Sequence, residues 1–178
     1  MRSSLSLDEL IALGRHRWAM ALLADLAAHR GARFVEMVNR LALPRDSLVR
    51  TLEAAVTAGW VMRNPGHGHP LRPEYLLTPL GQRMAAGALS IATAQIGLGL
   101  GPGALTRWGM PLIRAIGPGE ARFNDLARAL APATPRALSQ GLQALAVNEL
   151  VGRAVVDGWP PASLYRLTAG GLQLAKAA

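Results

Sequence analysis

Residues 75–81 read Tyr-Leu-Leu-Thr-Pro-Leu-Gly, and residues 165–171 read Tyr-Arg-Leu-Thr-Ala-Gly-Gly. Four of the seven positions are identical, and the two stretches lie 90 residues apart. Further pairs at this separation are Trp18 and Trp108, Leu48 and Leu138, Leu52 and Leu142, and Arg63 and Arg153. The dipeptides Arg33-Phe34 and Arg122-Phe123 match at a separation of 89 residues. A period this long does not suit a solenoid, so the sequence predicts two copies of one small domain.

Each copy shows a pattern of three helices. In the first copy, apolar residues recur on most turns from Leu10 to Ala28, and a shorter helix is predicted from Phe34 to Leu41. Their expected inward residues are Leu22, Leu23 and Leu26 on the first helix, and Met37 and Leu41 on the second.

The third helix of the first copy is expected to open at Pro44 and to end at Gly59, with Leu48, Leu52 and Ala55 on its buried face. In the second copy Thr134 is expected to cap the corresponding helix and Pro135 to start it. The inward residues there are Leu138, Leu142 and Leu145.

A hairpin is predicted after each third helix. Its strands are residues 60–63 and 74–78 in the first copy and 150–156 and 164–168 in the second, joined by turn-rich stretches at 64–73 and 157–163. Three helices followed by a hairpin are typical of a winged helix-turn-helix. We therefore expect a mainly α chain with small β-hairpins (α+β) that contains two tandem winged helix-turn-helix domains.

These motifs resemble the HxlR-type branch of the MarR-like winged-helix regulators. The resemblance is carried by the tryptophan of the first helix, the Arg-Phe start of the second, the Leu-x-x-x-Leu third helix, Gly-Trp-Val-x-Arg at residues 59–63, and Pro-x-x-Pro-Glu-Tyr-x-Leu-Thr-x-x-Gly from Pro70 to Gly81. It implies a homodimer whose two recognition helices enter successive major grooves, here fused into one chain. Many members of that family sense chemicals through a cysteine, and this chain has none.

The predicted domains are 1–83 and 105–178, with 84–104 as a linking, dimerisation-type segment. Met84 to Thr106 carries no charge and is long enough to span a bilayer. Because it contains Gln95, Pro102 and five glycines, we expect a helix from Met84 to Ile96 and a break at 97–103, and no membrane span.

Exposed positions on the two third helices are the predicted DNA-reading residues. They are Arg45, Ser47, Arg50 and Thr51 in the first copy, and Arg136, Gln140 and Gln143 in the second. Arginine suits guanine and glutamine suits adenine in the major groove, although exposed Arg and Gln on a helix are often merely solvated. The wings add expected phosphate or minor-groove contacts from Arg63, His67, His69, Arg72 and Arg153.

Charge supports a nucleic-acid partner. The formal charge is +8, and residues 1–90 hold 11 basic and 7 acidic side chains against 8 and 4 in the remainder, so each half carries +4. A basic balance attracts membranes and acidic proteins as well, so this support is weak by itself.

Other chemistry finds little support in the sequence. No phosphate loop, nucleophile elbow or carboxylate pair points to an enzyme, and we expect no cofactor. His67-Gly68-His69 lacks an acidic or thiol companion, so no metal is expected. The four tryptophans leave open an aromatic effector at the interface between the copies, although Trp18 and Trp108 are better explained by core packing.

The expected function is a cytoplasmic, sequence-specific regulator of transcription that binds double-stranded DNA, with repression as the expected mode. It is expected as a monomeric pseudo-dimer or a further homodimer. Two alternatives stay open, namely a winged-helix module that binds other proteins and an effector-binding regulator whose second DNA reader is degenerate.

Overall fold

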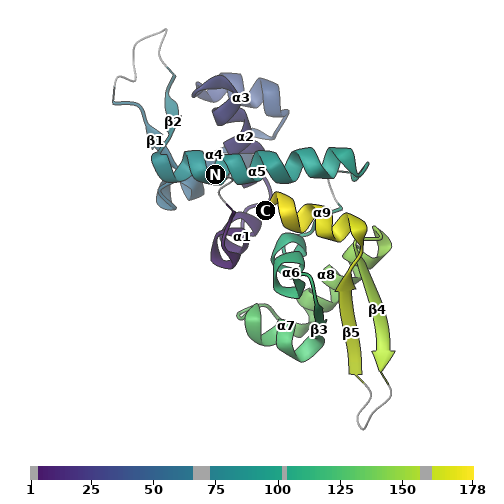
Figure 1. Cartoon of the computed structure of the whole chain (residues 1–178). Helices are drawn as coiled ribbons and strands as arrows, with labels where there is room; N and C mark the ends of the chain where they lie inside the picture. The colour runs from purple at the N-terminus through teal and green to yellow at the C-terminus, as the bar shows by residue number, and fades with distance from the viewer. Residues whose placement is uncertain (1–3, 66–72, 102–103, 157–161) are drawn as a thin grey trace. The chain divides into compact units, whose positions relative to one another are not determined.

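The computed structural model describes residues 4–65, 73–101, 104–156 and 162–178. The chain forms two compact units (Figure 1). The first unit consists of Met1–Leu5 and His16–Ser90, and the second of Ser6–Arg15 and Ile91–Ala178. The division into domains 1–83 and 105–178 with a linker stays a prediction.

The first unit contains a three-helix core followed by a hairpin. Its elements are α2 (Ala19–His29), α3 (Phe34–Leu41), α4 (Arg45–Thr57), β1 (Val61–Arg63), β2 (Tyr75–Leu77) and the portion of α5 (Pro79–Gly97) up to Ser90. On α2, α3 and α4 the largest fully buried side chains are Leu22, Leu23, Leu26, Met37 and Leu48. All of them lie at positions that the apolar spacing predicts as inward.

The second unit repeats this order. Its elements are α1 (Leu7–Gly14), the end of α5, α6 (Gly109–Ile116), β3 (Glu120–Arg122), α7 (Phe123–Ala129), α8 (Pro135–Val147), β4 (Val151–Val156), β5 (Ala162–Leu167) and α9 (Ala169–Ala177). The buried Leu112, Leu138 and Leu142 lie 90 residues after Leu22, Leu48 and Leu52. The sequence repeat is therefore a repeat of the core.

Several local predictions are confirmed. Helix α3 has the predicted bounds, and Thr134 caps α8 by accepting a hydrogen bond from the Ala137 amide at 3.2 Å. Pro44 is the N-cap of α4 and not its first residue, and Gly59 follows the helix with φ +71°, the left-handed conformation that glycine adopts readily. The predicted helix over 84–96 forms the larger part of α5.

The expected single helix from Leu10 to Ala28 is wrong. The chain forms α1 and α2 there, separated by a turn at residues 15–18, and the two helices belong to different units. Helix α1 packs on α6 within the second unit (Figure 1). A Cβ at Gly14 would stand 2.3 Å from the Arg107 carbonyl oxygen, so this tertiary contact needs glycine at the end of α1.

The β-structure of the second unit exceeds the predicted hairpin. Strands β4 and β5 form that hairpin, and β3 pairs antiparallel with β5 on its other edge, giving the order β3-β5-β4. In the first unit the same third position is a single bridge between Ala32 and Tyr75 beside the β1–β2 hairpin. The alternation of polar and apolar residues does not predict β3, because this strand is only three residues long.

The repeated Tyr-x-Leu-Thr-x-x-Gly stretch fixes each wing to its third helix. The Thr78 hydroxyl donates to the Gly59 carbonyl at 2.6 Å and accepts from the Gly81 amide at 3.0 Å. The Thr168 hydroxyl likewise donates to the Glu149 carbonyl at 2.6 Å and accepts from the Gly171 amide at 3.2 Å. One threonine thus caps the following helix and ties it to the end of the preceding one.

The final glycine of the motif is required by packing. A Cβ at Gly81 would lie 1.8 Å from the Trp60 carbonyl oxygen, and a Cβ at Gly171 would lie 2.2 Å from that of Leu150. Both distances are far below van der Waals contact, so glycine is needed at both positions.

None of the described helices is both long and apolar enough to cross a membrane.

Candidate nucleic-acid interface

Helix α4 is placed by a tight turn after α3. Ala42 adopts the left-handed conformation with φ +49°, Leu43 is buried, and Pro44 accepts the first backbone hydrogen bonds of α4 from Ser47 and Leu48. The residue before a proline avoids the helical region, so Pro44 also ensures that α3 does not continue into α4. This short connection makes α3 and α4 a helix-turn-helix.

The outward face of α4 carries mixed charge. Arg45, Asp46, Arg50 and Glu53 are exposed, opposite the buried Leu48 and Leu52. The Arg50 Nε donates to the Asp46 carbonyl at 3.3 Å, which leaves the rest of its guanidinium free to reach a ligand. Two arginines and two carboxylates therefore share this face.

The prediction that Thr51 lies exposed is wrong. Thr51 is only 5 % exposed, and its hydroxyl donates to the Ser47 carbonyl at 2.7 Å. It lies one turn from Leu48 and Ala55, so the buried face is wider than the leucine spacing indicates. Ser47 is half-buried at the edge of the same face.

Asp46 and Glu53 are the residues that the sequence-based prediction missed. Their spacing with Arg50, at i, i+4 and i+7, could have revealed them, because it places all three on one helix face. Carboxylates repel the phosphate backbone, so they restrict how α4 can approach DNA.

Helix α8 presents a different face. Arg136, Gln140 and Gln143 are exposed as predicted, opposite the buried Leu138, Leu142 and Leu145. The helix contains no carboxylate. Arg136 and Gln143 occupy the positions that Asp46 and Glu53 have in the first copy, 90 residues earlier. The second unit therefore offers donors suited to base edges without acidic neighbours on the same helix.

The bases of the two wings hold equivalent arginines in place. The Arg63 Nη2 donates to the Tyr75 hydroxyl at 3.2 Å and lies 3.8 Å from Glu74, and the hydrogen bond that Arg63 donates to Tyr75 raises the pKa of the guanidinium. Arg153 donates to the Ser163 Oγ at 2.9 and 3.1 Å. Both arginines stay exposed. The predicted contacts His67, His69 and Arg72 lie outside the described residues.

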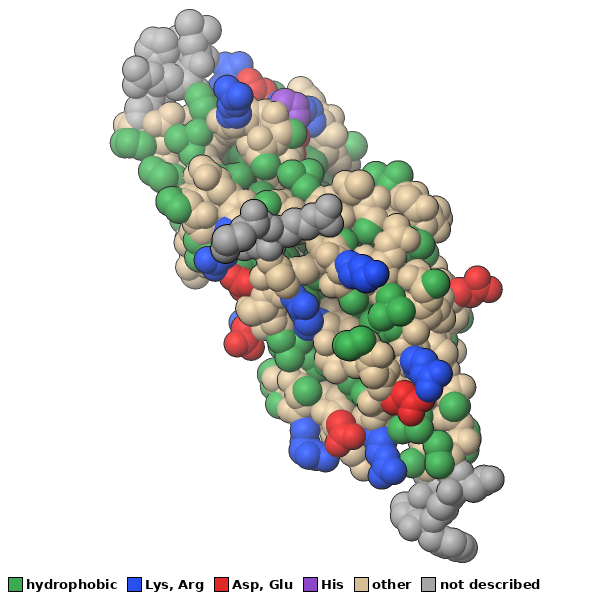
Figure 2. Space-filling view, viewed as in Figure 1, with side chains coloured by type: hydrophobic (Ala, Val, Ile, Leu, Met, Phe, Trp, Pro, Cys, Tyr) green, Lys and Arg blue, Asp and Glu red, His purple; other side chains and the backbone are tan. Residues whose placement is uncertain are grey.

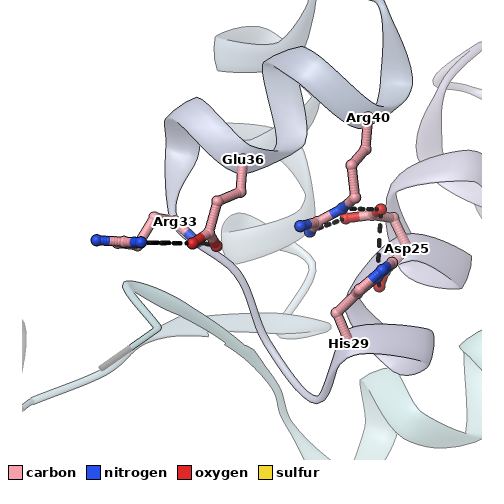
Figure 3. Close-up of polar contacts among 5 residues, drawn as sticks. All are labelled: Asp25, His29, Arg33, Glu36 and Arg40. Atoms are coloured by element: carbon pink, nitrogen blue, oxygen red, sulfur yellow. Dashed lines mark hydrogen bonds and ion pairs between the residues drawn. The ribbon is translucent and has the colours of Figure 1, made fainter. Parts of the chain in front are cut away.

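Helix α3, the first half of the helix-turn-helix, is held to α2 by one ion pair and capped at its own start by another (Figure 3). Arg40 donates to both carboxylate oxygens of Asp25 on α2, at 2.7 and 2.8 Å, and this hydrogen bonding raises the pKa of Arg40. At the other end, Glu36 accepts from the Arg33 backbone amide at 2.8 Å and from its side chain. These contacts stabilise α3, the helix that precedes α4 in the helix-turn-helix.

Basic side chains are dispersed over one face of the molecule. On the face shown in Figure 2, the Lys and Arg side chains of each unit are separated by acidic and neutral ones. The described residues contain no group of three His, Cys, Asp or Glu side chains able to hold a metal ion.

Two helix-turn-helix pairs, each followed by an antiparallel wing, define a tandem winged helix-turn-helix protein of the transcription-regulator class. The chain belongs to the HxlR-like helix-turn-helix family, whose sequence model matches it twice, over residues 13–93 and 105–177. The predicted tandem arrangement and the family resemblance are thereby confirmed. None of the curated proteins compared with it matches.

Solved structures with similarity to part of this chain are described as MarR-family transcriptional regulators. One, from Enterococcus faecalis V583, is 30 % identical over 50 % of this chain and 76 % of its own, with a TM-score of 0.40. Another, from Porphyromonas gingivalis W83, is 21 % identical over 48 % of this chain and 78 % of its own, with a TM-score of 0.40.

Proposed function

We propose that this protein represses transcription by binding a specific double-stranded DNA site with α4 and α8 as its two recognition helices. The observation that carries the proposal is the exposed face of α8, where Arg136, Gln140 and Gln143 stand at helical spacing with no carboxylate between them. Arginine pairs with guanine and glutamine with adenine in the major groove. On α4, Arg45 and Arg50 would make the corresponding contacts.

The two reading faces differ, so the operator is expected to be an imperfect palindrome. Recognition helices of a dimeric reader enter grooves one helical turn apart, about 34 Å. We propose the same spacing for the two half-sites of this single chain, with Arg63 and Arg153 contacting phosphates. A footprint that covers one half-site alone would contradict two-helix reading.

The test is fluorescence anisotropy with a duplex from the region beside the protein's own gene, a scrambled duplex and a salt series. Arg50→Glu with Arg136→Glu reverses one exposed charge on each recognition helix, and should abolish selective binding while leaving the melting temperature unchanged. The matched control reverses Arg15 and Lys176, which are also exposed but lie at the end of α1 and on α9. Equal loss in both double variants would show that total charge, and no particular surface, governs binding.

A rival function is favoured by the carboxylates of α4. Asp46 and Glu53, together with the exposed Val49 and Val56, suit a protein or small-molecule partner better than phosphates. In that case the first unit would serve an interaction and the second would read DNA. The single variants separate these cases, because Arg50→Glu would then leave DNA affinity intact and Arg136→Glu would abolish it.

A further inference from the structure

We propose that the first unit contains a binding site for an apolar organic cation, in a groove between α4 and the base of the wing. The groove has a volume of about 640 Å³, within the range of small-molecule sites. The residues that line it are Phe34, Val49, Leu52, Glu53, Val56, Thr57, Arg63, Glu74 and Tyr75. All of them belong to the first unit.

The body of the ligand is specified by the apolar wall. Val49 and Val56 are 39 % and 43 % exposed, and lie two turns apart on the flank of α4 beside Leu52. Phe34 closes the wall from the start of α3, and Tyr75 from β2. Burying two exposed valines against a ligand would be favourable by the hydrophobic effect. The Arg63 guanidinium already lies over the Tyr75 ring, 5.6 Å from its centroid, so Phe34 is the ring that suits a delocalised or quaternary cation.

The charge of the ligand follows from the rim. Glu53 and Glu74 contribute two carboxylates, and Arg63 contributes one cation that already contacts the Tyr75 hydroxyl and Glu74. Within the described part of the chain, Glu53 has no hydrogen-bond or ion-pair partner for its carboxylate. The groove is thus apolar with net negative charge, which favours an organic cation over an organic anion of the same shape.

The second copy provides an internal comparison. Ninety residues after Val49, Glu53, Val56 and Glu74 stand Ser139, Gln143, Ala146 and Leu164. Each substitution removes either an apolar or an acidic feature of the groove, whereas the shared framework residues Leu52, Arg63 and Tyr75 are kept as Leu142, Arg153 and Tyr165. The features that specify a cation are therefore confined to the first copy and are not needed for the fold.

The test uses titration calorimetry of the whole chain with tetraphenylphosphonium, and with tetraphenylborate as a matched anion. We expect saturable binding of the cation and at least about tenfold weaker binding of the anion. Glu53→Gln, which installs the residue of the second copy, should weaken cation binding about fivefold. The effect is limited to this size because the ion pair between Glu53 and the bound cation is partly exposed to water. Adding Val49→Ser should weaken it further.

Asp46→Asn is the control variant, since it removes one carboxylate from the same helix but does not line the groove. It should leave cation affinity unchanged. Equal affinity for the two probe ions, or equal loss in Asp46→Asn and Glu53→Gln, would overturn the proposal. No step of this measurement requires DNA, so a failure of the proposed DNA binding would leave its result interpretable.

Discussion

The Arg40 guanidinium on α3 donates two hydrogen bonds, of 2.7 and 2.8 Å, to the two carboxylate oxygens of Asp25 on α2. The Asp25 side chain is 6 % exposed and that of Arg40 is 29 % exposed, so the pair lies at the edge of the core. His29 also approaches Asp25, with its Nδ1 3.4 Å from a carboxylate oxygen. In the second copy the positions of Asp25 and Arg40 are occupied by Ala115 and Ala129, so the pair is absent there as a whole.

The two halves of this ion pair should respond unequally to removal. Arg40→Ala leaves a buried carboxylate whose remaining ion-pair partner among the described residues is His29, and should cost about 3 kcal/mol in the free energy of unfolding. Asp25→Ala leaves an arginine that can turn to water, and should cost about 1–2 kcal/mol. Urea denaturation measures both values.

The double variant Asp25→Ala with Arg40→Ala copies the second unit and should be more stable than Arg40→Ala alone. Additive losses in the double variant would mean that burial of the aspartate carries no penalty. Charge pairing would then not be what anchors α3 to α2.

The contact between Glu36 and Arg33 should make stability depend on acid pH. The Arg33 backbone and side-chain hydrogen bonds lower the pKa of Glu36 below its ordinary value of 4.5. Because the folded pKa is depressed, the stabilisation is fully present above pH 4.5 and is lost as pH falls through the folded pKa. The contribution is modest, about 0.5 kcal/mol, since the Arg33 side chain is 53 % exposed and that of Glu36 is 37 % exposed, so that water screens the pair.

The comparison that isolates this effect is Glu36→Gln against the unaltered chain, with urea midpoints measured from pH 7 to pH 3. The gap between the two proteins should close toward low pH. A gap that stays constant would assign the contribution to hydrogen bonding without charge.

The glycines of the repeated motif should be intolerant of a methyl group. Gly81→Ala places a Cβ against the Trp60 carbonyl, and Gly171→Ala places one against that of Leu150, so each should lose about 3 kcal/mol or more. Gly119→Ala is the control, because nothing lies within 4 Å of its Cβ position. Thermal unfolding that is equally affected by all three variants would contradict the packing argument.

Substitutions on α8 and at the base of its wing should separate base reading from phosphate contact. Gln143→Ala should cost about 1–3 kcal/mol of DNA affinity and relax the preference at one base pair. Arg153→Ala should weaken all sequences alike and reduce the slope of log affinity against log salt by about 1. Anisotropy on a panel of single-base variants distinguishes the two results, and an unaltered base preference in Gln143→Ala would remove this residue from the reading face.

Most of the helical framework could be predicted from the sequence. The bounds of α3 and the capped start of α8 followed from apolar spacing and from the residues Thr134 and Pro135, because caps and amphipathic faces are local properties. The exposure of Arg50, Arg136 and Gln140 followed in the same way. These predictions depend on neighbours within a few positions along the chain.

Other features depend on distant contacts and were missed. The break between α1 and α2 follows from the packing of α1 on α6 in the second unit, nearly a hundred residues away. The burial of Thr51 depends on how closely the core meets α4, and the acid-rimmed groove joins α4 to Glu74 across the chain. Apolar periodicity carries no information on such pairings.

The sequence by itself determined that one winged helix-turn-helix occurs twice, since the 90-residue repeat carries the caps, turns and core residues that each copy needs. Only the tertiary structure decided which residues complete each unit, which polar side chains are buried, and where carboxylates and apolar residues meet to form a groove. The physical reason is that local backbone preferences are encoded within a few residues, whereas burial and charge pairing arise from contacts that close over long loops.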